Sequence, residues 1–332
     1  MKLDNKYIIG THIMFYEIEM VPEYIQSLIN ATKDVENKNN ITVDLFFNLS
    51  EFFEKVDTTQ QDHHQLLNKF MIEKDKCIQQ GLNVKFKIYQ DDELYTIGDY
   101  RRDLNYHNCN EHDFIIWGES DCLVPKEIFN TLENISSYAN QNNINRYITT
   151  FATRKMWDES WSVLEHVDFE KNKFYDMKDE GWKTDKSSIW YTMTIEEMNK
   201  INSKSNELDI RILNEPKFDG SLLVISSDLI KSGVNIPHAC YACGEDASFE
   251  KMCKIIMGKA YVQFVVKNIL KVHNRVHPLK REYVQGEKNF ANVKQKRKSN
   301  SRWQNFHQIC EHNLYVLGTN QTKFKTVEEI DV

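Results

Sequence analysis

The chain has 332 residues, of which 41% are hydrophobic and 27% are charged, and its formal net charge is -7. This composition excludes a disordered chain and is enough for one large hydrophobic core or two modest ones. The acidic balance excludes the protein-wide positive field that nucleic-acid-binding proteins usually carry.

The sequence contains no apolar run close to the ~20 residues that a membrane-spanning helix needs. Residues 1–6 hold no apolar stretch of the length found in signal peptides, so we expect the protein to stay in the cytoplasm of the cell that makes it. Only five prolines and eleven glycines are present, which leaves no room for a long flexible linker. One compact unit with insertions is therefore expected.

Apolar runs alternate with amphipathic stretches over residues 1–151. Runs typical of buried strands lie at 6–13, 41–47, 84–89, 113–117 and 147–151. Helices are expected from Pro22, from Thr58 to about Gly81, over 98–108 (a helix or a turn), and around Ile128, Leu132 and Ile135. Strands that alternate with helices predict an α/β fold with a mostly parallel sheet flanked by helices.

The second half of the chain begins with a change of character. Residues 154–216 are rich in Trp, Lys, Asp and Glu and show little periodicity, so an irregular insertion is expected there. Regular patterning returns with a predicted strand at 218–225 and an amphipathic helix between Gly244 and Gly258. The remaining predicted strands lie at 261–266 and 269–273.

Three chemically useful side chains lie at predicted strand ends or helix starts, where open parallel sheets bind their ligands. Asp121 follows the strand 113–117, Asp246 begins a helix, and His273 ends a strand. A divalent cation that bridges two phosphates needs few protein ligands, because the phosphates and water supply the rest. One carboxylate with one imidazole would suit Mn²⁺, and a separate carboxylate could then act as a general base.

The order of these motifs resembles that of the GT-A nucleotide-sugar glycosyltransferases, in particular the inverting, family-2-like enzymes. The pieces that carry the resemblance are 98–105 (GDYRRDLN), 113–125 (DFIIWGESDCLVP), 218–225 (FDGSLLVI), 244–249 (GEDASF) and the pair Val272 and His273. Each piece falls at a predicted strand end or helix start, and they come in the family's order. The resemblance implies a GT-A-like fold and a metal-dependent transfer of a sugar from a nucleotide-diphosphate sugar to an acceptor hydroxyl, with inversion.

The resemblance also implies roles for the acidic residues. Asp121 would bind the metal, Mn²⁺ or Mg²⁺, with His273 as its second protein ligand. Glu119 would contact the ribose of the donor or a metal-bound water. Asp246 would be the general base, and Glu245 would help to hold the acceptor.

Four further residues would hold the nucleotide sugar by the same resemblance. Thr11 and Asn48, at the ends of the first two strands, lie where the family binds the nucleotide base, and Arg101 or Arg102 could reach the base or a phosphate. The sequence departs from the family pattern at two points. Glu119 replaces the first aspartate, and Asn48 replaces an acidic pair, so the identity of the donor nucleotide stays open.

On the acceptor side the resemblance places Gly220 and Gly244. The tryptophans of the insertion could stack on a sugar or a base, or could anchor the insertion to the sheet, and Trp182 is the candidate for a ligand contact. These expectations divide the chain into a catalytic domain over 1–277 and a C-terminal extension over 278–332. Within the first, 1–151 would be the nucleotide-binding half, 154–216 the insertion and 217–277 the acceptor and catalytic half.

A basic segment, Lys280–Arg302, reverses the sign of the otherwise acidic chain and is followed at once by aromatic residues. Basic side chains beside aromatics can bind a phosphate backbone and stack on a base, although such runs are usually solvated. The acceptor therefore stays open between a saccharide, a lipid-linked glycan and a hydroxylated DNA base of the kind that some phage glycosyltransferases modify. An anionic membrane surface would also attract this segment.

Two other functions compete with the glycosyltransferase hypothesis. A nucleotidyltransferase-like nucleotide-sugar enzyme should carry a glycine-rich phosphate loop near its N-terminus, and the turn after Ile13 has none. A carbohydrate- or nucleic-acid-binding module without catalysis would keep the fold but not the chemistry, and Glu119 in place of an aspartate is its one hint.

Overall fold

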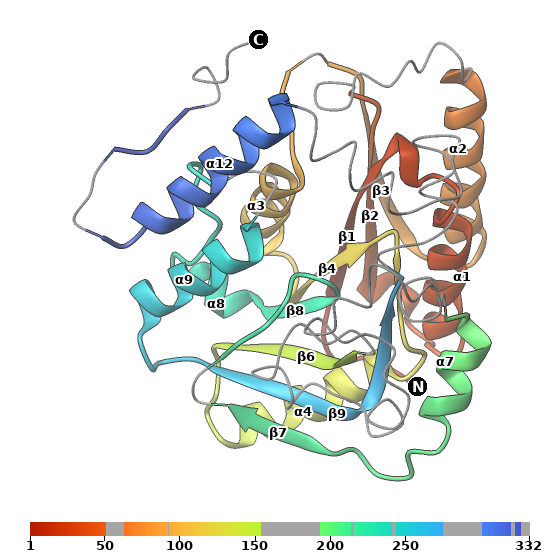
Figure 1. Cartoon of the computed structure of the whole chain (residues 1–332). Helices are drawn as coiled ribbons and strands as arrows, with labels where there is room; N and C mark the ends of the chain where they lie inside the picture. The colour runs from red at the N-terminus through yellow and green to blue at the C-terminus, as the bar shows by residue number, and fades with distance from the viewer. Residues whose placement is uncertain are drawn as a thin grey trace, which may run out of the picture.

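The computed structural model describes residues 1–50, 63–91, 93–153, 193–213, 216–240, 244–274, 301–319 and 323–326. Nine strands form one sheet in the order β3-β2-β1-β4-β8-β6-β9-β5, and β7 pairs with β9 at its side (Figure 1). In chain order they are β1 (Tyr7–Met14), β2 (Ile41–Asn48), β3 (Asn83–Tyr89), β4 (Phe114–Glu119), β5 (Cys122–Leu123), β6 (Tyr147–Thr153), β7 (Ile210–Leu213), β8 (Leu223–Ser226) and β9 (Val262–His273).

The first four strands of this order, β3-β2-β1-β4, pair in parallel throughout. Strand β1 lies inside this group, and the side chains of Tyr7, Ile8 and Ile9 are fully buried. Strands buried on both faces need near-continuous apolar sequence, which is why the apolar runs of the first half predict them well. Because these strands run in the same direction, their carboxyl ends meet at one edge of the sheet.

The rest of the sheet mixes directions. Strand β8 runs antiparallel to both β4 and β6, whereas β6 and β9 pair in parallel. The small strands β5 and β7 are both antiparallel to β9. The predicted α/β sheet flanked by helices is confirmed, with its parallel pairings concentrated in the first half of the chain.

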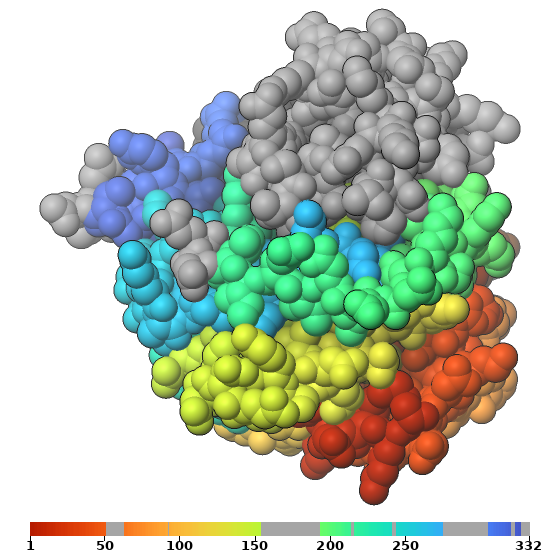
Figure 2. Space-filling model, turned by 90° about the horizontal axis from the view of Figure 1, so that it is seen from below, coloured from red at the N-terminus to blue at the C-terminus, as the bar shows by residue number. Residues whose placement is uncertain are grey.

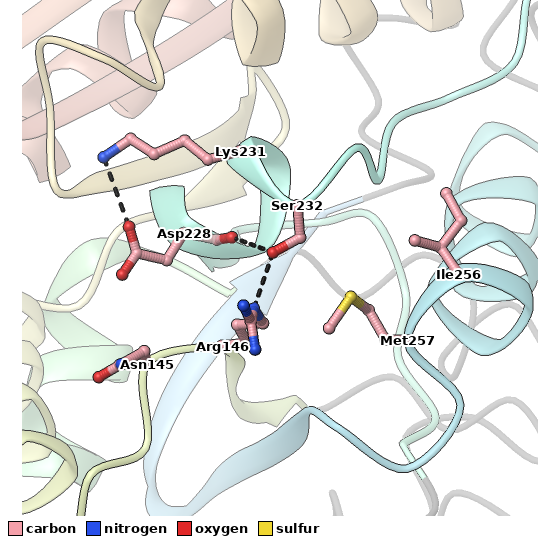
Figure 3. Close-up of a pocket in the computed structure, with 7 residues that line it drawn as sticks. All are labelled: Asn145, Arg146, Asp228, Lys231, Ser232, Ile256 and Met257. Carbon is pink, nitrogen blue, oxygen red and sulfur yellow. Dashed lines mark hydrogen bonds and ion pairs between the residues drawn. The ribbon is translucent and has the colours of Figure 1, made fainter.

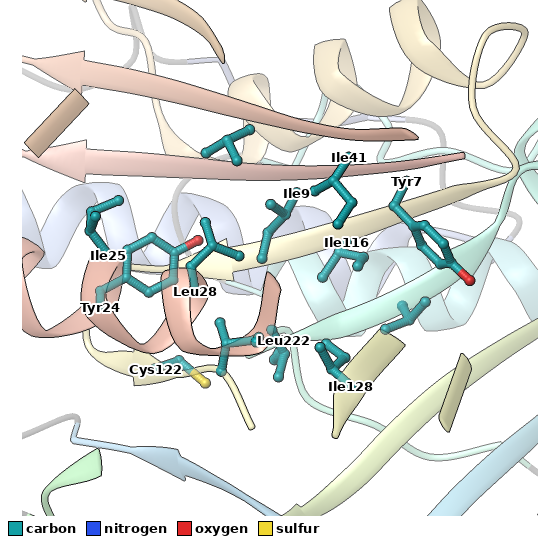
Figure 4. Close-up of a cluster of buried hydrophobic side chains, with 14 of the residues drawn as sticks. Tyr7, Ile9, Tyr24, Ile25, Leu28, Ile41, Ile116, Cys122, Ile128 and Leu222 are labelled. Atoms are coloured by element: carbon teal, nitrogen blue, oxygen red, sulfur yellow. The ribbon is translucent and has the colours of Figure 1, made fainter. Parts of the chain in front are cut away.

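Three helices cover one face of the sheet: α1 (Val21–Thr32), α2 (His63–Gln79) and α4 (Ile128–Gln141). Their buried apolar side chains form one continuous cluster with those of the strands, including Ile9 of β1. Figure 4 shows part of this cluster, in which Leu222 lies among side chains of α1 and the neighbouring strands. The cluster is the main hydrophobic core of the described chain.

The other face carries α3 (Ile97–Asn108), α8 (Ser227–Lys231) and α9 (Glu245–Met257). These helices pack in a second cluster with Ile8 of β1 and Trp117 of β4. Side chains alternate along a strand, so neighbouring apolar residues such as Ile8 and Ile9 reach opposite layers. This second layer brings α3 and the start of α9 to the carboxyl end of β4, where the site described below is located.

Smaller elements join these layers. Two 3-10 helices, η1 (Phe15–Glu17) and η2 (Lys38–Asn40), follow β1 and precede β2. Within the described part of the predicted insertion, helix α7 (Ile195–Asn202) and strand β7 are regular structure that the weak periodicity did not indicate. In Figure 2 the residues of this region are green, and they lie at the surface beside the yellow residues that include α4.

A C-terminal helix, α12 (Ser301–Val316), was not expected from the basic, polar sequence before it. It packs beside α9, where the Lys251 ammonium donates to the carbonyl of Leu314 at 2.9 Å. The Asn313 amide donates to the carbonyl of Ala239 at 2.7 Å, in the loop that leads to α9 (Figure 1). None of the helices in the described ranges combines the length and apolar character needed to cross a membrane.

Two predicted strand boundaries differ from the structure. Residues 218–222 form a turn instead of the start of a strand, because Leu222 has a φ of +47°, in the left-handed region that interrupts an extended chain. The predicted strands at 261–266 and 269–273 are one strand, β9, which passes through a register shift opposite Phe151 and Ala152. A bulge of this kind bends a strand without ending it.

Candidate active site

Two carboxylates and an imidazole converge at the carboxyl edge of the sheet. Glu119 ends β4, Asp121 lies in the following turn, and His273 ends β9. The Nε2 atom of His273 lies 3.1 Å from Oε2 of Glu119 and 3.5 Å from Oδ1 of Asp121. One ligand atom of each residue lies within 4.8 Å of the others, a spacing that could hold a metal ion.

A very short strand explains why Asp121 and His273 meet. Strand β5 pairs antiparallel with the end of β9, so that Cys122 lies opposite His273. The backbone N–H of Asn274 also donates to the carbonyl of Asp121 at 2.7 Å. The turn after β4 is thus tied to the end of β9, although 152 positions of sequence separate Asp121 from His273 (273 minus 121).

The donor set of this cluster suits a hard or borderline divalent cation. Carboxylate oxygens and one imidazole nitrogen are ligands that Mg²⁺ and Mn²⁺ accept. Burial alone would raise the pKa of Glu119, but the charges of His273 and Arg101 lower it to about 2. Burial would lower the pKa of His273, and the neighbouring carboxylates of Asp121 and Glu119 raise it instead. Because histidine binds a metal as the neutral imidazole, a cation at this position would take the place of the proton that the two carboxylates favour on His273.

Arg101 connects this cluster to a second acidic pair. Its Nη2 atom lies 2.6 Å from Oε1 of Glu119, and its Nη1 atom lies 2.6 Å from Oε1 of Glu245. Nη2 also donates to the carbonyl of Gly220 at 3.0 Å. The guanidinium is 4.8 Å from the ring centre of Trp117 and is almost completely buried. One planar cation thus fixes two carboxylates that come from β4 and α9.

The start of α3 explains the position of Arg101. Thr96 caps this helix: its hydroxyl accepts from the backbone N–H of Asp99, while the Asp99 carboxylate accepts from the backbone N–H of Thr96. This reciprocal cap fixes the first turn of the helix. Arg101 then lies on the helix face that packs against the sheet, directly above Trp117.

The second acidic pair, Glu245 and Asp246, begins α9. Gly244 precedes it with a φ of +75°, a left-handed conformation that glycine adopts without strain. Asp246 accepts two backbone N–H bonds, from Gly220 at 3.1 Å and from Ala247 at 2.7 Å. The resemblance places Gly220 and Gly244 on the acceptor side, and in the structure both lie beside Glu245 and Asp246.

The carboxyls of this pair hold their protons more tightly than usual. Burial, followed by the charge of Asp246, raises the pKa of Glu245 to about 8. Burial also raises the pKa of Asp246 above its ordinary value. Glu119, a few ångströms away across Arg101, is shifted in the opposite direction. Carboxyls whose pKa values are driven apart in one buried site are typical of acid–base chemistry.

Beside the charged site, the ends of β1 and β2 form a neutral polar cluster. The Asn48 amide nitrogen lies 3.1 Å from Nε2 of His12 and donates to the carbonyl of Tyr95 at 2.9 Å. Its oxygen accepts from the backbone N–H of Ser50 at 2.8 Å. Burial, followed by the charge of Arg101, lowers the pKa of His12 to about 3, so this imidazole stays neutral.

Two predicted nucleotide-binding residues point elsewhere. The Thr11 hydroxyl lies 2.6 Å from the Tyr24 hydroxyl of α1, on the face of the sheet opposite α3. Arg102 pairs with Asp99 and donates to the carbonyl of Pro237 at 3.3 Å. The structure therefore places Arg101 among the acidic residues and Asn48 in the neutral cluster beside them, whereas Thr11 and Arg102 lie outside both.

Trp182 and residues 275–300 of the basic segment lie outside the described residues, as do the side chains of 301–304. The structure therefore does not test the predictions for Trp182 and for the segment Lys280–Arg302.

Sequence reasoning missed one buried group at this edge, the ion pair of Lys271 with Asp219. The Lys271 ammonium donates to Oδ1 of Asp219 at 2.8 Å and to the hydroxyl of Ser221 at 2.9 Å. A signal was present in the sequence, because Lys271 precedes His273 by two positions in one strand and so shares its face. A lysine pointing to the buried side of a strand needs an acidic partner.

A separate pocket of about 500 Å³ lies at the opposite edge of the sheet (Figure 3). It is lined by Asn145, Arg146, Asp228, Lys231, Ser232, Ile256 and Met257. Within it the Arg146 guanidinium donates to the Ser232 hydroxyl at 2.7 Å. The lining includes none of the acidic residues described above, so the pocket is not part of the candidate active site.

No protein-family model matches the chain, and no curated protein is significantly similar to it in sequence. Among solved structures, TarS of S. aureus is 12% identical, with 98% of this chain and 77% of that chain covered and a TM-score of 0.42. The glucosyl-3-phosphoglycerate synthase of M. tuberculosis is 12% identical, with 85% and 78% covered and a TM-score of 0.37. Core-mannan synthase A of Aspergillus fumigatus, in its Mn/GDP form, is 9% identical, with 77% and 65% covered and a TM-score of 0.27. These are likenesses of fold, and at such values no residue role, substrate or partner is carried over to this chain.

Proposed function

We propose that the protein is a metal-dependent, inverting glycosyltransferase of the GT-A type, which moves a sugar from a nucleotide-diphosphate sugar to an acceptor hydroxyl. One observation carries the proposal. A carboxylate–imidazole cluster that suits a divalent cation lies next to a separate, partly buried carboxyl pair, and Arg101 bridges the two. Such a pair of sites matches a reaction with a charged leaving group on one side and a proton to remove on the other.

Asp246 acts as the general base in this proposal. Its raised pKa brings its proton affinity closer to neutral pH, where a base is most effective. It takes the proton of the acceptor hydroxyl as that oxygen bonds to the anomeric carbon, and the bond to the nucleoside diphosphate breaks. A single displacement of this kind inverts the anomeric centre.

Asp121 and His273 are the proposed protein ligands of the cation, with Glu119 within reach of the same position. A bound divalent cation supplies positive charge that stabilises the leaving nucleoside diphosphate. Arg101 acts by holding Glu119 and Glu245 in place, since both of its terminal nitrogens already contact carboxylates. The ion, Mn²⁺ or Mg²⁺, is not distinguished by the donor set.

The donor base, the sugar and the acceptor stay predictions. A saccharide or a lipid-linked glycan fits the proposal, and so does a hydroxylated DNA base held by the basic segment Lys280–Arg302. Reversing Lys296, Arg297 and Lys298 to Glu separates these acceptors. Donor hydrolysis should be unchanged, and transfer should fall only if the acceptor is a polyanion, with salt-dependent DNA retention of the wild type as the direct check.

A cytoplasmic location and the division of the chain at residue 277 also stay predictions. The contacts of α12 with α9 argue that part of the predicted extension belongs to the catalytic unit. A chain ending at residue 299 should therefore unfold at a lower temperature than the full chain.

The proposal is tested with a panel of nucleotide sugars in thermal unfolding, each with and without Mn²⁺, followed by an assay for release of the nucleoside diphosphate. A glycosyltransferase should be stabilised by one nucleotide class in the presence of the metal and should then release product. Stabilisation without release, for every acceptor and in water, would favour the binding module. Release of pyrophosphate from a nucleoside triphosphate would instead favour the nucleotidyltransferase-like enzyme.

A further inference from the structure

A buried lysine holds the turn that precedes β8. Lys271 of β9 is 1% exposed, and Asp219 is 5% exposed. The Lys271 ammonium donates to the Asp219 carboxylate, the Ser221 hydroxyl and the Ser221 carbonyl. An ammonium has three hydrogens, so these bonds engage all of its donors inside one turn. The Ser221 hydroxyl in turn lies 2.9 Å from Oδ1 of Asp219.

The turn needs to be held, because its backbone is strained. Leu222 has a φ of +47°, so the backbone of a residue with a bulky side chain lies in the left-handed region. This conformation costs on the order of 1 kcal/mol or more for a residue with a branched side chain and persists only where the surroundings enforce it. On one side the Leu222 side chain is buried in the main core (Figure 4). On the other side Lys271 fixes residues 219 and 221 by hydrogen bonds.

The strained turn presents Gly220 to both halves of the candidate active site. The Gly220 carbonyl accepts from Nη2 of Arg101 at 3.0 Å, and its N–H donates to Oδ2 of Asp246 at 3.1 Å. A Cβ atom at this position would clash with Nη1 of Arg101, so any other residue would displace the guanidinium from its place between Glu119 and Glu245. The backbone of one residue therefore contacts the proposed base and the arginine that organises the carboxylates.

We propose that Lys271 is a positioning residue for the base Asp246, acting through the turn of residues 219–222. The inference rests on the proposed role of Asp246. Lys271 and Asp219 hold the turn, the turn aims the N–H of Gly220, and that N–H stabilises the ionised form of the Asp246 carboxyl. A buried ion pair adds little net stability, because removing two charges from water offsets their attraction. Its better attested role is to fix one local conformation, which here is that of the turn.

The contact from Gly220 has a measurable consequence. A hydrogen bond to the charged form of a carboxyl lowers its pKa, and Gly220 lowers that of Asp246 in this way against the larger effect of burial. Loosening the turn should therefore raise the pKa of Asp246 further. Ser221→Ala loosens the turn without changing any charge, whereas Lys271→Met also removes the positive charge that faces the Asp219 carboxylate. The two variants thus separate the effect of geometry from the effect of charge.

The experiment measures the Asp246 carboxyl by ¹³C NMR titration of aspartate-labelled protein, with the resonance assigned by its loss in Asp246→Asn. The pH profile of donor turnover is measured alongside. In Ser221→Ala and Lys271→Met the pKa of Asp246 and the acidic limb of the profile should both move upward, by roughly one unit in Lys271→Met. Lys74→Met is the matched control, because Lys74 is a buried lysine 2.9 Å from Asp75 on α2, outside the site.

The possible results are distinct. An unchanged Asp246 pKa in Ser221→Ala and Lys271→Met, or an equal shift in Lys74→Met, overturns the positioning role. If Lys271→Met does not fold, Ser221→Ala decides alone. If the wild type turns over no nucleotide sugar but the pKa of Asp246 still moves in both variants, the proposed function fails while the positioning of this carboxyl by Lys271 stands.

Discussion

Two polar clusters share the carboxyl edge of the sheet and are built in opposite ways. At the ends of β1 and β2, Asn48 and a neutral His12 are joined by ordinary hydrogen bonds. At the ends of β4 and β9, the charges of Arg101 and Glu119 lie together, and the same guanidinium contacts the Glu245 carboxyl. Both clusters join the ends of strands to neighbouring loops or helices. Because the first cluster does this with neutral side chains, buried charges are not needed to hold these segments together.

The difference between the clusters indicates where the chemistry lies. Removing a charge from water costs several kcal/mol, whereas a buried amide that keeps its hydrogen bonds costs little. The neutral cluster shows that this fold can hold strand ends in place without the desolvation cost of a charged group. The charges at the second cluster therefore need another reason, and catalysis with a cation is the reason that we propose.

The largest expected effect is on turnover in Asp246→Asn. Loss of a general base typically lowers the rate by a factor on the order of 10² to 10⁴, while nucleotide binding should be nearly unchanged because the cation cluster is intact. Steady-state kinetics and nucleotide titration measure the two quantities. Asp228→Asn on α8 is the control with an exposed aspartate. Near-wild-type turnover in Asp246→Asn would remove this residue as the base.

The second effect is on stability and compares the clusters directly. Arg101→Met removes the buried guanidinium that balances the charge of Glu119 and holds Glu245, so the free energy of unfolding should fall by about 3–5 kcal/mol. Asn48→Ala removes only neutral hydrogen bonds and should cost about 1–3 kcal/mol. Urea denaturation at neutral pH measures both. Equal losses in the free energy of unfolding would mean that the charged network contributes no more to stability than the neutral one, which would contradict the comparison.

A third prediction concerns the cation. Chelation by EDTA should abolish turnover, and Mn²⁺ or Mg²⁺ should restore it. Asp121→Ala and His273→Ala should each weaken metal-dependent binding of a nucleoside diphosphate by about tenfold or more, because each removes one of few protein ligands. Asp113→Ala, just before the start of β4, serves as the control. Turnover that persists in EDTA would exclude the metal site from the mechanism.

The fourth prediction is a pH dependence of stability. Glu245 binds its proton more tightly in the folded protein, with a pKa of about 8 against an ordinary value of 4.5. The folded state therefore holds this proton up to about pH 8, so the contribution of Glu245 to stability falls as pH rises from 4.5 towards 8. His12 acts in the opposite direction below pH 6.5, because only the unfolded chain protonates this imidazole there, so the fall in stability should be clearest between pH 6.5 and 8. Glu245→Gln should flatten the curve of urea midpoint against pH, and an unchanged curve would contradict the raised pKa.

The comparison also explains what the sequence could predict. The parallel strands are continuous apolar runs, so their periodicity located β1, β2, β3 and β4 to within about two residues. The acidic residues and His273 were placed at strand ends because such ends share an edge. Their approach to one another depends on the two-residue strand β5 and its pairing with β9, which no local pattern indicates.

Other features lay beyond single-sequence reasoning for physical reasons. The run 218–225 ends in the apolar stretch Leu222–Ile225 and so predicts a strand, yet Leu222 is held in a left-handed conformation by tertiary contacts. The role of Arg101 as a bridge depends on Glu245, which is 144 positions away. Local propensity carries no information on such distant pairs, and Thr11, at a strand end like the others, points to the opposite face.

The most direct test of the central claim is one calorimetric and kinetic series with a nucleotide sugar and Mn²⁺, in wild type, Asp121→Ala and Asp246→Asn. The wild type should bind the donor and release the nucleoside diphosphate. Asp246→Asn should bind it with similar affinity but release at least about a hundredfold more slowly, and Asp121→Ala should lose metal-dependent binding. If Asp246→Asn and Asp121→Ala lose binding and turnover to the same extent, the two sites are not separate and the proposed division of labour is wrong.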